Sequence, residues 1–157
     1  MSRLAVGLDV STLRIGWGIV TEDLEPVAHG AIFFKRGQWV TPGMRAETME
    51  DALENFDVDL IGLEAVFVGI NKLGSIRAAM ALGQVESIAD YLWPDSEQKV
   101  LTATQWRAAC GIPQGGKEPV MEWAVNLCNK YEVGLPESQD AADAIGIAYA
   151  TIVWHSG

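Results

Sequence analysis

The chain has 157 residues, of which 49% are hydrophobic and 20% are charged, and its formal net charge is −10. A chain of this length and composition forms one domain with a substantial core, which excludes an intrinsically disordered protein. The acidic balance argues against general coating of nucleic acid, because that binding depends on Lys and Arg neutralising phosphates. No signal peptide is expected, since the first apolar run is short and is interrupted by Asp9. Cys110 and Cys128 are therefore expected to be reduced thiols in the cytoplasm.

The first third of the chain predicts three strands and a helix. Residues 3–10, 15–21 and 27–35 are short apolar or alternating runs separated by turn residues. Three such runs in succession predict an antiparallel meander, with the first strand placed to be central. Residues 43–56 carry apolar side chains at helical spacing and predict an amphipathic helix.

The remaining elements predict parallel strands and further helices. Residues 58–64 are apolar on both faces, which is typical of a parallel strand reached through a crossover helix. A long helix over 75–92 is apolar around most of its circumference, so we expect it to pack on its own core and on a partner. A fifth strand is expected at 98–103 and helices at 104–110, 120–131 and 137–154. The most apolar stretch, about 141–154, is too short to span a bilayer.

This order of elements predicts an α/β fold. The sheet is mixed and five-stranded, with three antiparallel and two parallel strands flanked by helices, in one domain over 1–157. It is the order of the ribonuclease H-like fold, in which acidic residues gather at the edge of two adjacent central strands.

Four acids follow or begin apolar elements. Asp9 and Glu64 each end a buried strand, and Asp140 and Asp143 lie one turn apart at the start of an apolar helix. Any one of them alone is better explained as a turn residue, a solvated charge or a partner of the helix dipole. All four together favour one cluster. Four clustered carboxylates repel one another without a cation, and Mg²⁺ prefers oxygen ligands, so the pattern predicts a divalent metal site.

Other motifs are weaker. His29 and His155 lie in no nucleophile pattern. Gly115-Gly116-Lys117 matches half of a phosphate-binding loop, but Glu118 stands where that loop needs Ser or Thr.

Four segments resemble the RuvC-type Holliday junction resolvases, the crossover junction endodeoxyribonucleases, and together they span almost the whole chain. They are Gly7-Leu8-Asp9-Val10-Ser11 with Gly16-Trp17-Gly18-Ile19-Val20, Leu63-Glu64-Ala65-Val66-Phe67, Ala81-Leu82-Gly83-Gln84, and Asp140-Ala141-Ala142-Asp143-Ala144-Ile145. The last is the most specific. The chain departs from the family in a longer loop after Glu64 and in its acidity, a divergence that is familiar in phage and viral branches.

The resemblance implies a homodimer, paired through helix 75–92, that binds four-way DNA junctions and nicks two strands symmetrically with Mg²⁺ or Mn²⁺. It implies that the four acids are the catalytic metal ligands and that Lys117 is a catalytic lysine contacting DNA near the scissile phosphate. Phe67 corresponds to an aromatic that probes the junction centre. The remaining basic side chains expected to contact DNA are Lys72, Arg77 and Arg107.

Three alternatives stay open. A broader nuclease would cut other branched DNA as well. A second alternative is an ATPase or sugar-kinase-like protein, because Gly7-x-Asp9-x-Ser11 with Gly16 also resembles the first phosphate loop of that related fold. It is disfavoured because 157 residues leave no room for a second half of similar size. A non-catalytic junction-binding protein would lack at least one of the four acids, and all four are present.

Overall fold

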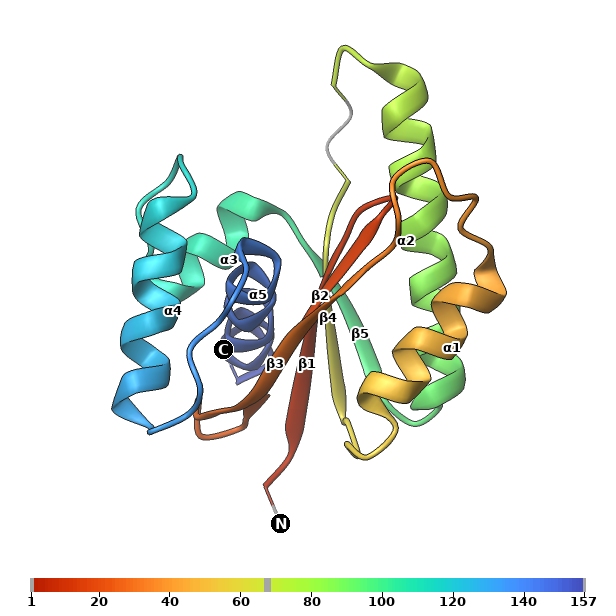
Figure 1. The fold of residues 1–157 in the computed structure, drawn as a ribbon. Coiled ribbons are helices and arrows are strands. Elements are labelled where there is room, and N and C mark those ends of the chain that lie inside the picture. Colours follow the sequence, from red (N-terminus) through yellow and green to blue (C-terminus); the bar gives the residue numbers. More distant parts are fainter. Residues whose placement is uncertain (1, 67–68, 157) are drawn as a thin grey trace.

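A central sheet lies between two layers of helices (Figure 1). The computed structural model describes residues 2–66 and 69–156. The helices α1 (Pro42–Leu53) and α2 (Lys72–Leu92) cover one face of the sheet, and α3 (Ala103–Cys110), α4 (Glu118–Lys130) and α5 (Gln139–Ser156) cover the other. In this described part of the chain, no helix combines the length and the apolarity needed to cross a membrane.

The sheet has the order β3-β2-β1-β4-β5, which puts the first strand in the centre as expected. Its strands are β1 (Leu4–Val10), β2 (Arg14–Thr21), β3 (Pro26–Phe33), β4 (Leu60–Glu64) and β5 (Glu97–Leu101). The first three form an antiparallel meander, whereas β4 and β5 extend the sheet in parallel from β1. The central strands are apolar on both faces because both faces are covered by helices.

Capping side chains move several element boundaries from their predicted positions. The second helix begins at Lys72 rather than 75, because the Asn71 side chain accepts a hydrogen bond from Gly74 N at 2.9 Å. The fifth strand ends at Leu101 rather than 103, because Thr102 forms a capping box with Gln105 and starts α3. The last helix runs over Gln139–Ser156 rather than 137–154.

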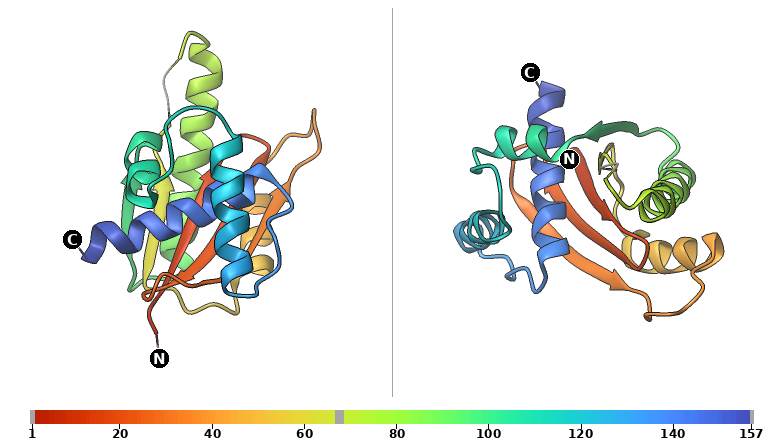
Figure 2. Two further views of the ribbon diagram at one scale, coloured as in Figure 1. Left: turned by 90° about the vertical axis from the view of Figure 1, so that its left-hand side faces the viewer. Right: turned by 90° about the horizontal axis from the view of Figure 1, so that it is seen from above.

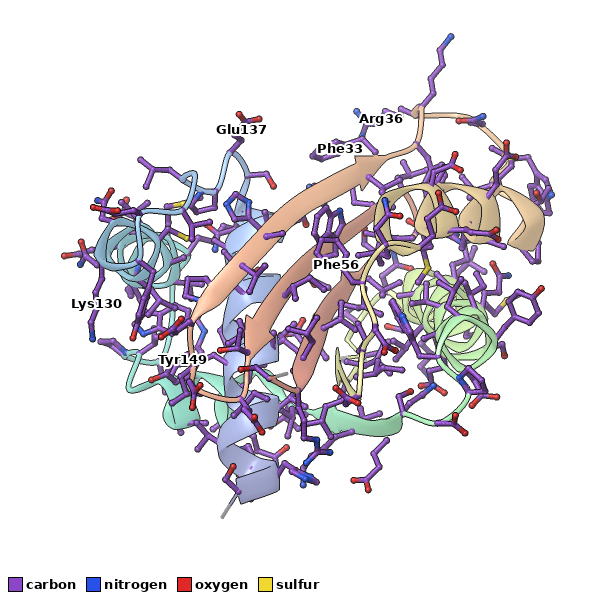
Figure 3. The ribbon with its side chains drawn as sticks, turned by 90° about the horizontal axis from the view of Figure 1, so that it is seen from below. Phe33, Arg36, Phe56, Lys130, Glu137 and Tyr149 are labelled. Atoms are coloured by element: carbon purple, nitrogen blue, oxygen red, sulfur yellow. The ribbon has the colours of Figure 1, made fainter. Side chains whose placement is uncertain are left out.

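One aromatic pair joins the end of α1 to the sheet, and another joins α4 to α5; Figure 3 labels one ring of each pair, Phe56 and Tyr149. Phe56, just after α1, packs against Trp17 of β2 with ring centroids 6.0 Å apart. On the other face, Trp123 of α4 meets Tyr149 of α5 edge to face at 5.2 Å.

The helix α5 lies directly on the sheet and crosses its strands (Figure 2). Gly18, Gly7 and Gly62 are register partners on β2, β1 and β4, so three adjacent strands present a row without side chains. A Cβ at Gly7 would overlap the backbone of Ala144 and Ala148, and one at Gly62 would overlap Thr151. This row of glycines therefore sets how closely α5 approaches the sheet.

Candidate active site

The C-terminal ends of β1 and β4 bring two of the acids to one edge of the sheet. Leu8 and Leu63 are paired across these parallel strands, and Asp9 and Glu64 follow directly. Both strands are buried up to that point. The two carboxylates thus stand where the sheet first meets solvent.

The first turn of α5 brings the other two acids. Gly16 of β2 is the register partner of Asp9, and a Cβ at Gly16 would overlap the backbone carbonyl of Asp140. Asp143 follows one turn later, close enough for its charge to act on Asp9. The structure thus brings together the four acids that the sequence placed at the ends of separate elements.

Burial and mutual repulsion act on this acid cluster (Asp9, Glu64, Asp140 and Asp143). Burial, followed by the charges of Asp143, Glu64 and Asp140, raises the pKa of Asp9 to about 8. Burial also raises the pKa of Asp143 to about 6, against the effect of a hydrogen bond from Gln139. In the described part of the chain, no Lys or Arg forms an ion pair with Asp9, Glu64 or Asp143. The cluster therefore has unbalanced negative charge.

Neighbouring side chains hold three of the carboxylates in place. The indole Nε1 of Trp106 donates to Glu64 Oε1 at 2.9 Å. The Gln139 side chain donates to Asp143 Oδ1 at 2.8 Å, and Arg14 Nη1 lies 3.7 Å from Asp140 Oδ2.

Trp106 is the positioning residue that the sequence did not reveal. It lies on α3 and is buried to 1% exposure. Its ring fits under Gly146 of α5, where a Cβ would come within 2.6 Å of the ring. A buried indole N–H needs a hydrogen-bond acceptor. In the sequence, this general requirement is the one indication that Trp106 could contact a polar side chain.

The donor set suits a hard divalent cation such as Mg²⁺, because it consists of partly exposed carboxylates with excess negative charge. Within residues 2–66 and 69–156, no three His, Cys, Asp or Glu side chains form a ready-made cage for one ion. Mg²⁺ does not require such a cage, since it usually keeps water and takes one or two carboxylates together with substrate phosphates.

The loop before α4 carries Lys117 at the same edge of the sheet. Arg107 shapes this loop by donating to the carbonyls of Pro113, Gly115 and Gly116. Lys117 is exposed at the N-cap of α4, and its side chain makes no capping hydrogen bond. Arg107 was expected to contact DNA; here its donors serve the loop, and a DNA contact remains a prediction.

The start of α2 carries the other predicted DNA contacts. Lys72 and Arg77 are both exposed on its first two turns. Phe67 lies outside the described residues. The same part of α2 exposes Leu73, Ile76 and Met80 by 58%, 56% and 60%. This apolar face is the one that the sequence predicted for a partner.

Comparison with known proteins finds similar sequences and similar folds. No family model matches the chain. Proteins named crossover junction endodeoxyribonuclease RuvC from Chlamydia pneumoniae and Chlorobaculum parvum are 27% and 24% identical to it. These matches cover 94% and 95% of this chain, and 91% and 81% of those proteins.

Solved structures give the same result for the fold. T. thermophilus RuvC in complex with a Holliday junction substrate superposes with a TM-score of 0.80 at 16% identity, covering 98% of this chain and 95% of that one. Fowlpox virus resolvase, solved with Holliday junction DNA, gives 0.55 at 12% identity, covering 98% and 99%. The chain is similar to RuvC proteins in sequence and has the fold of the solved RuvC structures. The resemblance and the ribonuclease H-like fold predicted from the sequence are confirmed.

Charge is polarised along the sheet of this chain. Most basic residues lie at the edge that holds the acid cluster, and they are Arg14, Lys35, Arg36, Lys72, Arg77, Arg107 and Lys117. The turns at the opposite end are acidic and carry Glu22, Asp23, Glu25, Glu54, Asp57, Asp59, Asp95 and Glu97. The net charge of −10 therefore does not describe the edge that holds the acid cluster.

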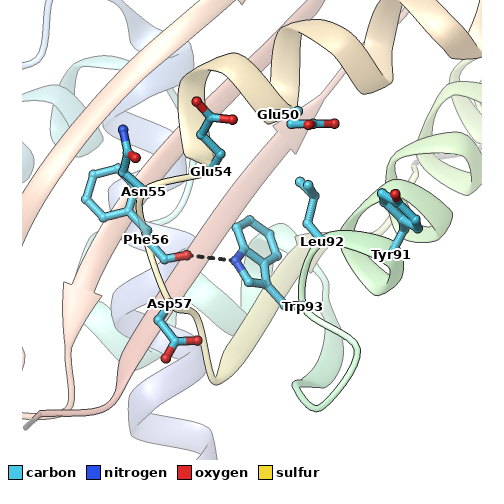
Figure 4. A pocket seen from close by; sticks show the side chains of 8 residues that line it. All are labelled: Glu50, Glu54, Asn55, Phe56, Asp57, Tyr91, Leu92 and Trp93. Carbon is cyan, nitrogen blue, oxygen red and sulfur yellow. Dashed lines mark hydrogen bonds between the residues drawn. The ribbon is translucent and has the colours of Figure 1, made fainter.

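A cavity of about 520 Å³ lies away from the acid cluster, between the C-terminal ends of α1 and α2 (Figure 4). Its lining is Glu50, Glu54, Asn55, Phe56, Asp57, Tyr91, Leu92 and Trp93. Three of these side chains are acidic and none is basic, so the cavity does not suit a phosphate group.

Proposed function

We propose that this chain, acting over 1–157 as one nuclease domain, is a metal-dependent endonuclease that resolves four-way DNA junctions by paired symmetric nicks. The observation that carries the proposal is the meeting of Asp9, Glu64, Asp140 and Asp143 at one sheet edge. Similarity to RuvC proteins along nearly the whole chain supports it.

In this proposal the acid cluster holds Mg²⁺, for which Mn²⁺ can substitute. The bound cations would supply a hydroxide nucleophile and neutralise charge at the scissile phosphate. Trp106 keeps Glu64 in a fixed orientation, and Gln139 does the same for Asp143. Because these contacts hold the carboxylates before substrate arrives, the ligands need little reorganisation on binding.

Lys117 is assigned to the DNA near the scissile phosphate. It is an exposed cation on a loop that Arg107 holds through three backbone carbonyls. We expect Lys117→Ala to slow cleavage more than it weakens junction binding. Equal losses in both would make Lys117 a simple phosphate anchor.

The exposed apolar face of α2 is assigned to a second copy of the chain. Leu73, Ile76 and Met80 follow one another at helical spacing, and Gly83 continues the face with open space above it. An isolated, half-exposed apolar stripe of this kind is typical of a helix that packs on a partner. Two copies would provide the two acid clusters that paired nicks require.

The experiment that tests the function is cleavage of a synthetic four-way DNA junction in Mg²⁺ or Mn²⁺, with a Y-fork and linear duplex alongside. Symmetric nicks that disappear in Asp9→Asn are expected. Equal cutting of forks would indicate the broader branched-DNA nuclease. A folded, dimeric protein that cuts none of these substrates would contradict the proposal and favour a binding protein or a nucleotide-dependent relative.

A further inference from the structure

The segment after β3 emerges at the same sheet edge as the acid cluster. Phe33 pairs with Arg14 of β2, one position beyond the pair of Ile15 with Val10 of β1. Phe34 N then donates to Leu13 O at 2.8 Å, which extends the pairing past the end of the strand. The chain therefore leaves the sheet at the same edge as Asp9, with β2 lying between the two strands.

The base of this segment is fixed in the core. The Phe34 ring packs against the apolar core, and the Arg45 guanidinium lies 5.5 Å from its centroid. Arg45 is only 5% exposed and donates to Thr12 O at 3.0 Å and to Gln84 Oε1 at 2.9 Å. These contacts join the segment to the turn that follows Asp9 and to α2.

The tip of the segment is a closed turn. Gln38 N donates to Lys35 O at 3.0 Å, and the Gln38 side chain accepts from Lys35 N at 3.0 Å. Gly37 takes φ +81°, a left-handed conformation that glycine adopts without strain. The turn thereby presents Arg36 at its tip in a preformed shape (Figure 3).

The outward side chains of this segment are mostly aromatic or basic. Phe33 is 61% exposed and Trp39 is 85% exposed, and both flank the exposed Lys35 and Arg36. Neither cation forms a salt bridge within the described residues. No Asp or Glu occurs between Glu25 and Glu47. We call residues 33–39 the aromatic–basic arm.

The chemistry of the aromatic–basic arm fits nucleic acid better than protein. Two cations free of acidic partners, in a chain of net charge −10, match the phosphates of a polyanion. Exposed aromatic rings between such cations provide platforms on which unpaired bases stack. An apolar protein surface would leave both cations without partners, so it fits less well.

We propose that the aromatic–basic arm is a second DNA contact, in which Lys35 and Arg36 bind backbone phosphates and Trp39 stacks on an unpaired base of the strand that enters the acid cluster. The inference rests on the proposed nuclease function and assigns part of its substrate: junctions with unpaired nucleotides beside the cleavage site. Phe33 offers a second stacking platform closer to the sheet.

The test measures DNA binding in EDTA, where no cleavage occurs. The probes are two fluorescently labelled four-way junctions, one fully paired and one with two unpaired thymines at the crossover. Trp39→Ala should weaken binding of the unpaired junction about tenfold, the effect of losing one stacked base, and of the paired junction much less. Trp39→Phe should restore most of that loss.

Arg36→Ala provides an independent readout. It should weaken binding of both junctions and reduce the slope of log K against log salt by about 1, as expected for one lost phosphate contact. The matched controls are Tyr91→Ala, an exposed aromatic at the opposite end of the sheet, and Lys130→Ala, an exposed cation on α4. Both should bind as the wild type does.

Three results would overturn the inference. If Trp39→Ala and Arg36→Ala bind and respond to salt like the wild type, the arm does not contact DNA, although the proposed function stands. If Trp39→Ala instead disrupts the dimer in sedimentation, the arm packs on a second copy. If the wild type neither binds nor cuts any junction, the proposed function and the inference fail together. Thermal unfolding of each variant checks that it is folded.

Discussion

The two ends of the central sheet carry the same kind of side chain in opposite surroundings. At one end, Asp9 and Asp143 are packed between the sheet and α5, and burial raises the pKa of each. At the other end, Glu22, Asp23 and Asp95 project from exposed turns. The first set is constrained and lies among basic residues, whereas the second set is solvated.

The difference teaches that a carboxylate becomes part of a site through the packing of its neighbours. Asp9 faces three other acids because α5 lies on a row of glycines and begins over β2, where its first turn carries Asp140. At the opposite end, Glu22, Asp23 and Asp95 lie on exposed turns, where water can solvate their carboxylates. Holding several carboxylates close together costs free energy of folding, and the chain bears that cost at the edge where a function could use the cluster.

The largest expected effect is loss of a proposed metal ligand. Asp143→Asn should slow junction cleavage by at least about 10²–10³-fold, the range seen when one electrostatic contact to a transition state is removed. Junction binding should persist because the side chain keeps its size. Asp95→Asn at the opposite end is the matched control and should cut normally. Normal cleavage by Asp143→Asn would remove this residue from the site.

A steric substitution tests whether the glycine row assembles the acid cluster. Gly7→Ala forces a Cβ against the backbone of Ala144 and Ala148, so it should lower the free energy of unfolding by about 3 kcal/mol or more. Cleavage should fall with it because α5 carries Asp140 and Asp143. Gly43→Ala, whose Cβ would meet only Thr41 Oγ1 at 3.9 Å, should leave both unchanged or slightly improved. Denaturant unfolding would show the contrast.

Removing one buried charge should stabilise the metal-free protein. The pKa of Asp9 is about 8 in the folded state against an ordinary value of 3.8, so the folded state binds the extra proton between these limits. Stability of the wild type should therefore fall as pH rises from about 4 to about 8. Asp9→Asn lacks this loss and should be more stable by about 2 kcal/mol at pH 8 in EDTA, with little difference near pH 4.

Melting curves at several pH values would measure this gap. A constant gap from pH 4 to pH 8 would show that Asp9 is not destabilised by its surroundings. Added Mg²⁺ should narrow the gap, since the cation stabilises only the protein that retains the carboxylate.

The smallest effect is expected from the neighbour of a ligand. Trp106→Phe keeps most of the buried ring but loses the hydrogen bond to Glu64, so cleavage should slow about tenfold. The deficit should shrink at high Mg²⁺ if the indole acts by orienting a ligand. A rate equal to the wild type would mean that Trp106 serves only in packing. Trp123→Phe on α4 is the matched control, and it should cut at the wild-type rate.

Local patterns in the sequence determined the elements and their types. Asp9, Glu64 and the Asp140–Asp143 pair stand out because each interrupts or opens an apolar run, and apolar periodicity follows from which faces must be buried. Element boundaries were less well predicted, since Asn71 and Thr102 act through capping contacts that move a helix start by a few residues.

Only the tertiary structure decided which distant groups meet. Trp106 reaches Glu64 from another element, and Arg45 joins Thr12, Phe34 and Gln84, because folding brings these positions together across long sequence separations. The sequence likewise could not show that the basic residues share one end of the sheet. That arrangement depends on strand direction: β1, β3 and β4 all end at the edge that the acid cluster occupies, so the loops that follow them meet there.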